Sequence, residues 1–182
     1  MSNLLPTPRH DDIFADIRSP TSGGTAWTVA GINDTSFQIG WLANNSTDMF
    51  QLTIQCTHKR RMGSNLDSIH LHYILESSAT SGQTIIWTPT YTWVKPGDVI
   101  PANASWTSLG TVTQTLGTTS AFYYGLFNFG TNIAPPAGES YGSMILFKVT
   151  RGNGTHTGRI GVLDCDAHSL MDRFGSVNEV TD

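Results

Sequence analysis

Charge is scarce in this sequence. Lys, Arg, Asp and Glu make up 13% of the 182 residues, and the formal net charge is -4. This charged share is about half of that in an average globular protein. So small a net charge does not favour binding to nucleic acid or to an anionic membrane, and we expect neither as a partner. The polar surface is built instead from Thr, Ser, Asn and Gly, which suits a chain that packs against copies of itself or against other proteins.

Long apolar runs and a secretory signal are also missing. No stretch is apolar over the roughly 20 residues that a membrane-spanning helix needs. The start, MSNLLPTPRHDD, does not have a charged region followed by an apolar one, so we expect that the protein is made and used without Sec export. The two cysteines, Cys56 and Cys165, lie in apolar, strand-like runs, and this position favours buried thiols over a disulfide.

Helical periodicity is nearly absent, whereas strand patterns recur between clusters of Gly, Pro, Asn and Ser. We expect nine strands, at residues 25–30, 36–41, 49–58, 68–76, 83–94, 105–115, 121–128, 141–150 and 159–168. This number is typical of a two-sheet sandwich. The expected fold class is therefore all-β, a jelly-roll-like antiparallel β-sandwich.

Three parts are expected along the chain. Residues 1–24 contain two prolines and no periodicity, which predicts an extended N-terminal arm with at most one helical turn. Residues 25–170 form the β-sandwich domain. Residues 171–182 are polar and form a C-terminal tail. Arms at both ends of a compact β domain are typical of subunits that reach across to their neighbours, although loose termini give the same pattern.

Two histidines stand in the strand-like segment DSIHLHYILE. Residues two apart on a strand face the same way, so His70 and His72 share a face. The same parity places Asp164, Asp166 and His168 on one face of the later segment LDCDAH. If the two strands are neighbours, these side chains converge. The cluster then holds either a metal ion or a network of hydrogen bonds within or between subunits; we favour the network and expect neither a metal nor a cofactor.

Two further groups are candidates for binding a partner. The aromatic row Trp87, Tyr91 and Trp93 lies on one face of the strand expected at 83–94. Exposed, this row would stack on sugars; buried, it belongs to the core or to a subunit interface, and burial is favoured because large aromatic side chains are mostly buried. The second group is a basic loop, HKRRM, which offers Lys59, Arg60 and Arg61 to an acidic partner surface.

Signatures of common enzyme classes are missing. The sequence contains no Gly-x-Ser-x-Gly on a strand–turn–helix and no glycine-rich phosphate loop. Neither cysteine stands in basic surroundings that would lower the pKa of its thiol. We therefore expect a protein that is not an enzyme.

Several segments, in order over most of the chain, carry a resemblance. They are DDIFADIRSP, DSIHLHYILESS, IIWTPTYTWVKPGDVIP, SMILFKVTR and GVLDCDAHSLMDRFGSVNEV. The last contains the pattern D-x-H-x-x-x-D-x-x-G-S-x-x-E, carried by Asp166, His168, Asp172, Gly175, Ser176 and Glu179. In these features the chain resembles a family of small virion proteins of tailed bacteriophages.

This resemblance implies a jelly-roll-like subunit that assembles in several copies on a phage particle. The expected role is a capsid decoration or cement subunit on the virion, a homotrimer that binds the phage major capsid protein. The resemblance also adds Asp172 to the expected network of polar interface residues. A neck, collar or tail component is the alternative within this class. A carbohydrate- or receptor-binding jelly roll is a second alternative, and a metal-dependent enzyme built on the histidines is a third.

Overall fold

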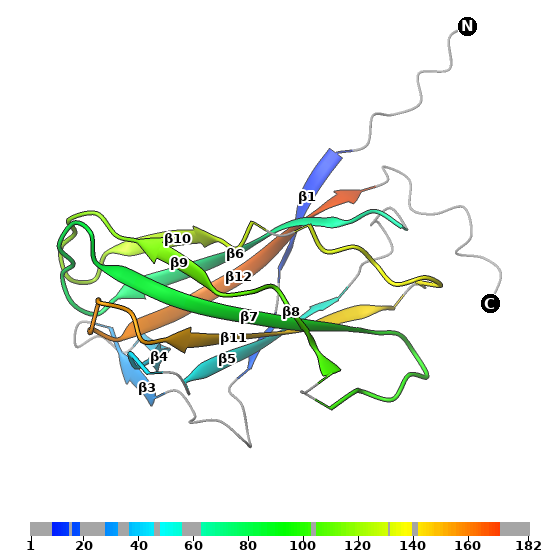
Figure 1. Ribbon diagram of the computed structural model, residues 1–182, viewed down its shortest axis with the longest axis horizontal. Helices are drawn as coiled ribbons and strands as arrows, with labels where there is room; N and C mark the ends of the chain where they lie inside the picture. The colour runs from blue at the N-terminus through cyan, green and yellow to red at the C-terminus, as the bar shows by residue number, and fades with distance from the viewer. Residues whose placement is uncertain are drawn as a thin grey trace, which may run out of the picture.

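The chain forms two antiparallel β-sheets, as a computed structural model shows (Figure 1). The structure describes residues 9–14, 16–18, 28–32, 37–45, 48–55, 63–102, 105–130, 132–139 and 142–171. Twelve strands are present in these residues. The predicted all-β sandwich is therefore confirmed.

Sheet 1 contains six strands, with β12 paired to neighbours on both sides. Its order is β10 (Tyr124–Asn128), β6 (Leu66–Leu75), β12 (Ile160–Met171), β4 (Gln38–Leu42) and β3 (Thr28–Gly31), and β1 (Arg9–Phe14) also pairs with β12. Sheet 2 contains the other six strands. Its order is β2 (Asp16–Arg18), β5 (Met49–Gln55), β11 (Met144–Gly152), β7 (Thr84–Val94) and β8 (Thr107–Ser108), and β9 (Val112–Thr115) also pairs with β7.

Each of the nine expected strand regions contains a strand, with one of them divided. The strand expected at 105–115 is two short strands, β8 and β9, which pair with different parts of β7. The interruption lies opposite Pro89, whose carbonyl oxygen accepts a bond of 3.0 Å from the Leu109 amide. Proline has no N–H to donate in return, so a continuous ladder cannot pass this position.

The N-terminal segment differs from the expected arm. Within the range 1–24, β1 pairs with β12 of sheet 1 and β2 pairs with β5 of sheet 2. These residues therefore belong to both sheets of the sandwich, and Figure 1 shows β1 running beside the end of β12. The expected boundary at residue 24 is corrected accordingly. Residues 172–182 of the expected tail lie outside the described residues.

The core lies between the inward faces of the two sheets. In β5 the side chains alternate between the two faces, with Phe50, Leu52 and Ile54 buried. Trp87 is fully buried and packs near Phe127 and Phe129. Since each fully buried large side chain contributes roughly 1.5–3 kcal/mol, this layer supplies the main stabilisation of the fold.

An extra residue in β12 reverses the alternation of that strand. Ile160 and Val162 point into the core, and so do Cys165 and Ala167, although the two pairs differ in parity. The pairing with β6 shifts register between Val162 and Asp164, which marks a β-bulge. The bulge turns the even-numbered residues that follow it, including Asp166 and His168, away from the core.

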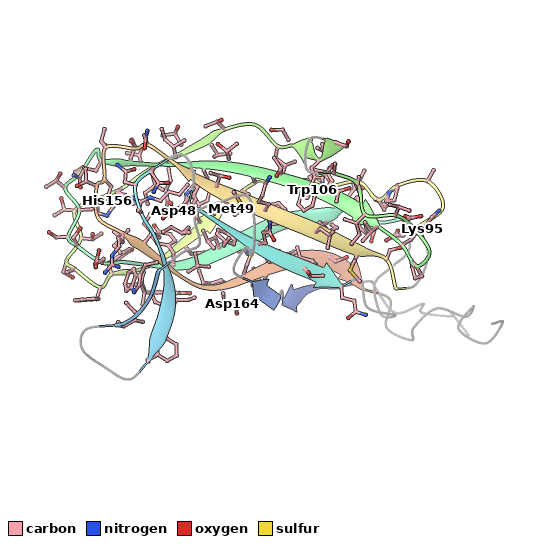
Figure 2. The ribbon with its side chains drawn as sticks, turned by 90° about the horizontal axis from the view of Figure 1, so that it is seen from below. Asp48, Met49, Lys95, Trp106, His156 and Asp164 are labelled. Carbon is pink, nitrogen blue, oxygen red and sulfur yellow. The ribbon has the colours of Figure 1, made fainter. Side chains whose placement is uncertain are left out.

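A buried arginine joins three segments at one end of the sandwich. Arg151 is 0% exposed. It donates hydrogen bonds to the carbonyl oxygens of Leu42 at 2.6 Å and His156 at 2.9 Å. Burial lowers the pKa of Arg151 to about 10, and the nearby Asp48 carboxylate opposes this change, so the guanidinium remains charged at neutral pH. Figure 2 shows Asp48 and His156 at the same end of the molecule, with Lys95 at the other.

We predict that Arg151→Met destabilises the fold by about 2–4 kcal/mol, because two carbonyl groups and a carboxylate lose a buried charged partner. The matched control is Arg159→Met. Arg159 holds Glu76 in a surface ion pair, and such pairs contribute under about 1 kcal/mol. Urea unfolding at neutral pH measures both free energies. Equal losses in the two variants would show that Arg151 has no special role.

A second prediction concerns pH. His156 is 1% exposed, and burial, followed by the charge of Arg151, lowers its pKa. Its neutral form is favoured in the folded state, whereas the unfolded side chain has a pKa near ~6.5. The stabilisation that neutral His156 gives to the folded state is therefore fully present above the unfolded pKa. It is lost as the pH falls from that value through the lower pKa of the folded state. We expect His156→Gln to lose less unfolding free energy than the parent between pH ~7.5 and ~5.5 in urea titrations; an unchanged loss would contradict this.

Candidate functional site

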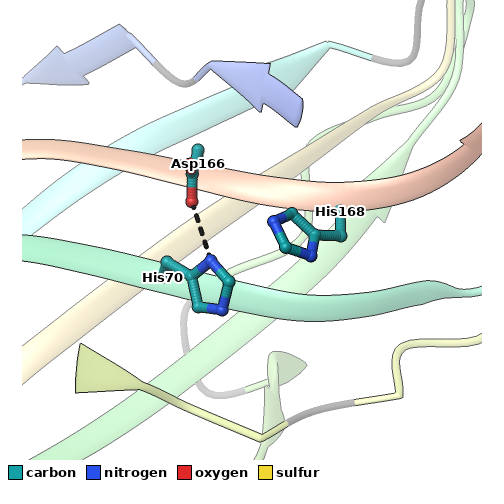
Figure 3. Close-up of side chains that lie close together, drawn as sticks. All are labelled: His70, Asp166 and His168. Atoms are coloured by element: carbon teal, nitrogen blue, oxygen red, sulfur yellow. Dashed lines mark ion pairs between the residues drawn. The ribbon is translucent and has the colours of Figure 1, made fainter. Parts of the chain in front are cut away.

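The predicted polar cluster forms on the outer face of sheet 1. β6 and β12 are antiparallel neighbours, with Asp166 opposite His70 and Asp164 opposite His72 in the register. His168 lies two residues beyond Asp166 and shares its face. Figure 3 shows His70 rising from β6 beside Asp166 and His168 of β12. The two segments therefore lie side by side, which was the condition for the expected convergence of these side chains.

The carboxylate of Asp166 is the centre of this cluster. Its Oδ1 atom lies 3.3 Å from His70 Nδ1, and its Oδ2 atom lies 3.6 Å from His72 Nε2. The rings of His70 and His168 meet edge to face, with centroids 4.5 Å apart. Asp166 is 6% exposed, and within the described part of the chain its Oδ1 atom has no hydrogen-bond partner. A nearby positive charge would stabilise a carboxylate buried in this way.

A tyrosine on the neighbouring strand orients one of the histidines. The Tyr124 hydroxyl and His72 Nδ1 are 2.6 Å apart, and the two rings stack with centroids 6.0 Å apart. Because the ring nitrogens have different partners, His72 reaches Asp166 with Nε2 while Nδ1 faces Tyr124. The contact connects β10, β6 and β12 across the face of the sheet.

Asp164 and Asp12 are further acidic residues near the cluster, and Cys165 lies between Asp164 and Asp166 in the sequence. Asp164 Oδ1 accepts a bond of 2.7 Å from the Cys165 amide. Burial, with the charges of Asp166 and Asp164, raises the pKa of the Cys165 thiol well above its usual value. Cys165 is therefore an inert core thiol, as expected, while Cys56 lies outside the described residues. β1 places Asp12 opposite His168 in the register. The cluster as a whole offers imidazole nitrogens and carboxylate oxygens to a cation.

The aromatic row and the basic loop were the other predicted groups. Trp87 is fully buried in the core and therefore cannot contact a partner. Tyr91 and Trp93 are partly buried and pack against the same core. The favoured interpretation of this row as buried agrees with these positions, and its role as a sugar platform is not supported. The basic residues Lys59, Arg60 and Arg61, and also Asp172, lie outside the described residues.

An exposed aromatic strip was missed by the sequence reading. Phe122, Tyr123, Tyr124 and Leu126 are 38%, 45%, 54% and 52% exposed; we call these four residues the β10 strip. Tyr124 and Leu126 face outward because Gly125 between them faces the ring of Tyr73, which would lie 2.3 Å from an added Cβ atom. Phe122 has a φ of 57°, an unfavourable backbone angle for a side chain of this size.

A groove on sheet 2 is the second feature that sequence reasoning missed. It has a volume of about 400 Å³ and is lined by Trp106, Gln51, Thr53, Leu146 and Ile100, among others. The Lys148 ammonium lies 5.5 Å from the centre of the Trp106 ring. Trp106 donates to the Pro101 carbonyl at 3.1 Å, which fixes its ring. Figure 2 shows Trp106 and Asp164 on different sides of the molecule, so the groove and the polar cluster are separate.

Comparisons with known proteins give no family. No protein-family model and no curated protein matches the chain. Among solved structures, it is similar to a carbohydrate-binding module specific for non-crystalline cellulose, at 12% identity over 85% of this chain and 87% of the other, with a TM-score of 0.41. A carbohydrate esterase from the Shiga toxin-encoding bacteriophage phi24B matches at 12% identity, over 86% and 90% of the chains, with a TM-score of 0.33.

A third structure is that of infectious bursal disease virus, Gx strain, at 12% identity over 92% of this chain and 33% of the other, with a TM-score of 0.30. Similarity at this level carries no argument about activity or ligands. The fold class stands on the strand pairing itself. Within the described part of the chain, no helix is long and apolar enough to span a bilayer.

Proposed function

We propose that this chain is a structural subunit of a tailed-bacteriophage virion. Its role is capsid decoration or cementing: it binds copies of itself, as a homotrimer, and the phage major capsid protein. A neck, collar or tail position is the alternative within the same class. The observation that supports an assembly role is the β10 strip. It offers four exposed apolar or aromatic side chains, two in the turn before β10 and two in the strand itself. Exposed patches of this kind mark interaction sites.

The strip has the composition of an interface. Aromatic side chains are enriched at protein–protein interfaces and include many of the residues that dominate binding. Ile74 lies opposite Tyr124 in the register and is only partly buried, so it extends the apolar surface onto β6. The turn before β10 holds Phe122 at positive φ, which costs about 1–2 kcal/mol for a residue other than glycine. Strain retained beneath an exposed ring is typical of functional positions.

The position of β10 in the sheet favours contact with another chain. Among the described strands, β10 is the end strand of sheet 1 and pairs with β6. The outer edge of such a strand presents backbone groups that can pair with a strand of a neighbouring molecule. A low content of charged residues, 13%, reduces the cost of removing water from such contacts.

We predict that the double variant Tyr124→Ser, Leu126→Ser loses self-association and capsid binding by at least roughly tenfold. Both side chains are exposed, so the subunit itself should remain folded. The matched control is Val99→Ser, which removes a side chain that is 91% exposed in another part of the molecule. Light scattering after size exclusion measures the oligomer, and co-sedimentation with capsids measures binding. Assembly of the double variant at the level of the parent protein would rule out the strip.

The virion role has its own test. Mass spectrometry of purified particles of the phage that encodes the chain should detect it in many copies, and a reconstruction of particles with and without it should show where it lies. Particles that lack the chain would refute a virion role. Density confined to the neck or tail would refute decoration of the capsid and support the alternative.

Binding of carbohydrate is a second candidate, and the groove at Trp106 is the observation that favours it. An indole ring beside the amide of Gln51 and the hydroxyl of Thr53 offers the apolar face and the polar groups that a sugar ring requires. The groove replaces the row of Trp87, Tyr91 and Trp93 as the position of this function.

On this second proposal, Trp106→Ala should abolish binding on a glycan array, with a loss of at least roughly tenfold in affinity for any glycan that the parent binds. Phe37→Ala is the control, because Phe37 is an exposed aromatic side chain, 60% exposed, outside the groove. A parent protein that binds no glycan, or a variant that retains all binding, would remove the groove from consideration.

A further inference from the structure

We infer that the outer face of sheet 1 holds a binding site for one divalent transition-metal ion, formed by His70, Asp166 and His168. Each of these residues offers a ligand atom, and the three atoms lie within 4.8 Å of one another. The site stands on two neighbouring strands whose register is fixed by the pairing of Asp166 with His70 (Figure 3). The inference does not depend on the proposed virion role.

The separations fit a metal ion. Zinc lies about 2.0–2.2 Å from nitrogen and oxygen ligands, so two ligands of a tetrahedral ion are roughly 3.4 Å apart. The Nδ1 atom of His70 and the Oδ1 atom of Asp166 are 3.3 Å apart. His168 approaches His70 edge to face, with ring centroids 4.5 Å apart. The three ligand atoms lie within 4.8 Å of one another, so binding of the ion would bring the third atom closer by rotation of its side chain.

The state of Asp166 is the second, independent observation. Asp166 is more than nine-tenths buried, at 6% exposure, and its Oδ1 atom has no hydrogen-bond partner among the described residues. This is the oxygen that faces His70. Burying an ionised carboxylate without compensation is costly, so a cation at this position is stabilising. A metal ion would supply positive charge directly to this oxygen.

The arrangement of the three imidazole rings also fits a metal ion. Nitrogen atoms of His70 and His72 lie 3.3 Å and 3.6 Å from the two carboxylate oxygens of Asp166, and His168 meets His70 edge to face. A divalent ion is bound by neutral imidazoles and by the carboxylate together, so it satisfies all three ligands without repulsion.

His72 and Tyr124 support the carboxylate from the other side. His72 Nε2 is 3.6 Å from Asp166 Oδ2, the oxygen that the metal would leave free. The Tyr124 hydroxyl, 2.6 Å from His72 Nδ1, fixes the orientation of that ring. Residues that hold a ligand in this way are a regular part of protein metal sites.

The chemistry of the ligands selects the class of ion. Two imidazole nitrogens and one carboxylate oxygen suit zinc and its first-row neighbours, whereas calcium and magnesium require oxygen ligands. Three protein ligands leave a further coordination position for water or for a group from another molecule. We therefore choose zinc as the probe and cobalt(II) as its spectroscopic substitute.

The test uses the full chain without a polyhistidine tag, freed of metal with EDTA and then dialysed. Titration with zinc chloride, followed by calorimetry and elemental analysis, should give one zinc ion per chain and a higher melting temperature with zinc than without. Cobalt(II) should give visible absorption bands typical of bound, low-symmetry coordination. Asp166→Asn and His168→Gln should each reduce the zinc affinity by at least roughly tenfold.

The control is Asp67→Asn, the same chemical change at an exposed carboxylate on β6. It should bind zinc like the parent protein. The inference is overturned if the parent binds less than stoichiometric zinc at neutral pH, or if Asp166→Asn binds it as tightly as the control does. The cobalt spectrum of the parent protein needs no variant, so it remains decisive if a variant fails to fold.

Discussion

The extra residue in β12 determines what the surface of sheet 1 presents. Before the bulge, Ile160 and Val162 face the core; after it, Cys165 and Ala167 do so. In an unbroken strand, Asp166 and His168 would share the inward face of Val162 and would be buried among apolar side chains. That burial would cost several kcal/mol for the carboxylate alone. A local irregularity in one strand therefore creates the polar cluster and also protects the core.

β12 also links the two halves of sheet 1, β10–β6 on one side and β4–β3 on the other. β6 pairs along most of its length on one side, while β4 and β1 share the other side. Since β1 continues into β2, which pairs with β5, the N-terminal segment ties this strand to the opposite sheet. At the β11–β12 turn, Arg151 donates to carbonyl groups of two further segments. Tertiary pairing and a buried charge, rather than local propensity, hold the margins of the sandwich.

The sequence alone predicts most of the fold and part of the site. Period-two alternation is a local property, so β5 and β6 could be located from it, and their buried residues alternate with that period. β1 and β2 could not be located, because the sequence DDIFADI has no apolar alternation; the two strands are defined by their pairing with β12 and β5. In the sequence, the apolar residues that fill the core change from even to odd positions between Val162 and Cys165. This change indicates a bulge. Parity within LDCDAH was sufficient to place Asp166 and His168 together.

Exposure was harder to predict than strand position. Trp87 and Trp106 are equally aromatic in the sequence, yet the first fills the core and the second lines a groove, because only the packing of the layers decides which is covered. The run FYYGL has no alternation, and its outward face is set by a contact across strands, between Gly125 and the ring of Tyr73. Such contacts depend on register, which a single sequence does not specify in advance.

The β10 strip and the polar cluster form one surface. The contact between Tyr124 and His72 connects the aromatic residues to Asp166, and all three lie on adjacent strands of one sheet. A cation that fixes Asp166 would also restrict His72, and through it Tyr124. Less side-chain entropy would then be lost when the strip binds another molecule, which raises affinity without adding contacts. A cation held at the centre of this face would therefore prepare its edge for assembly.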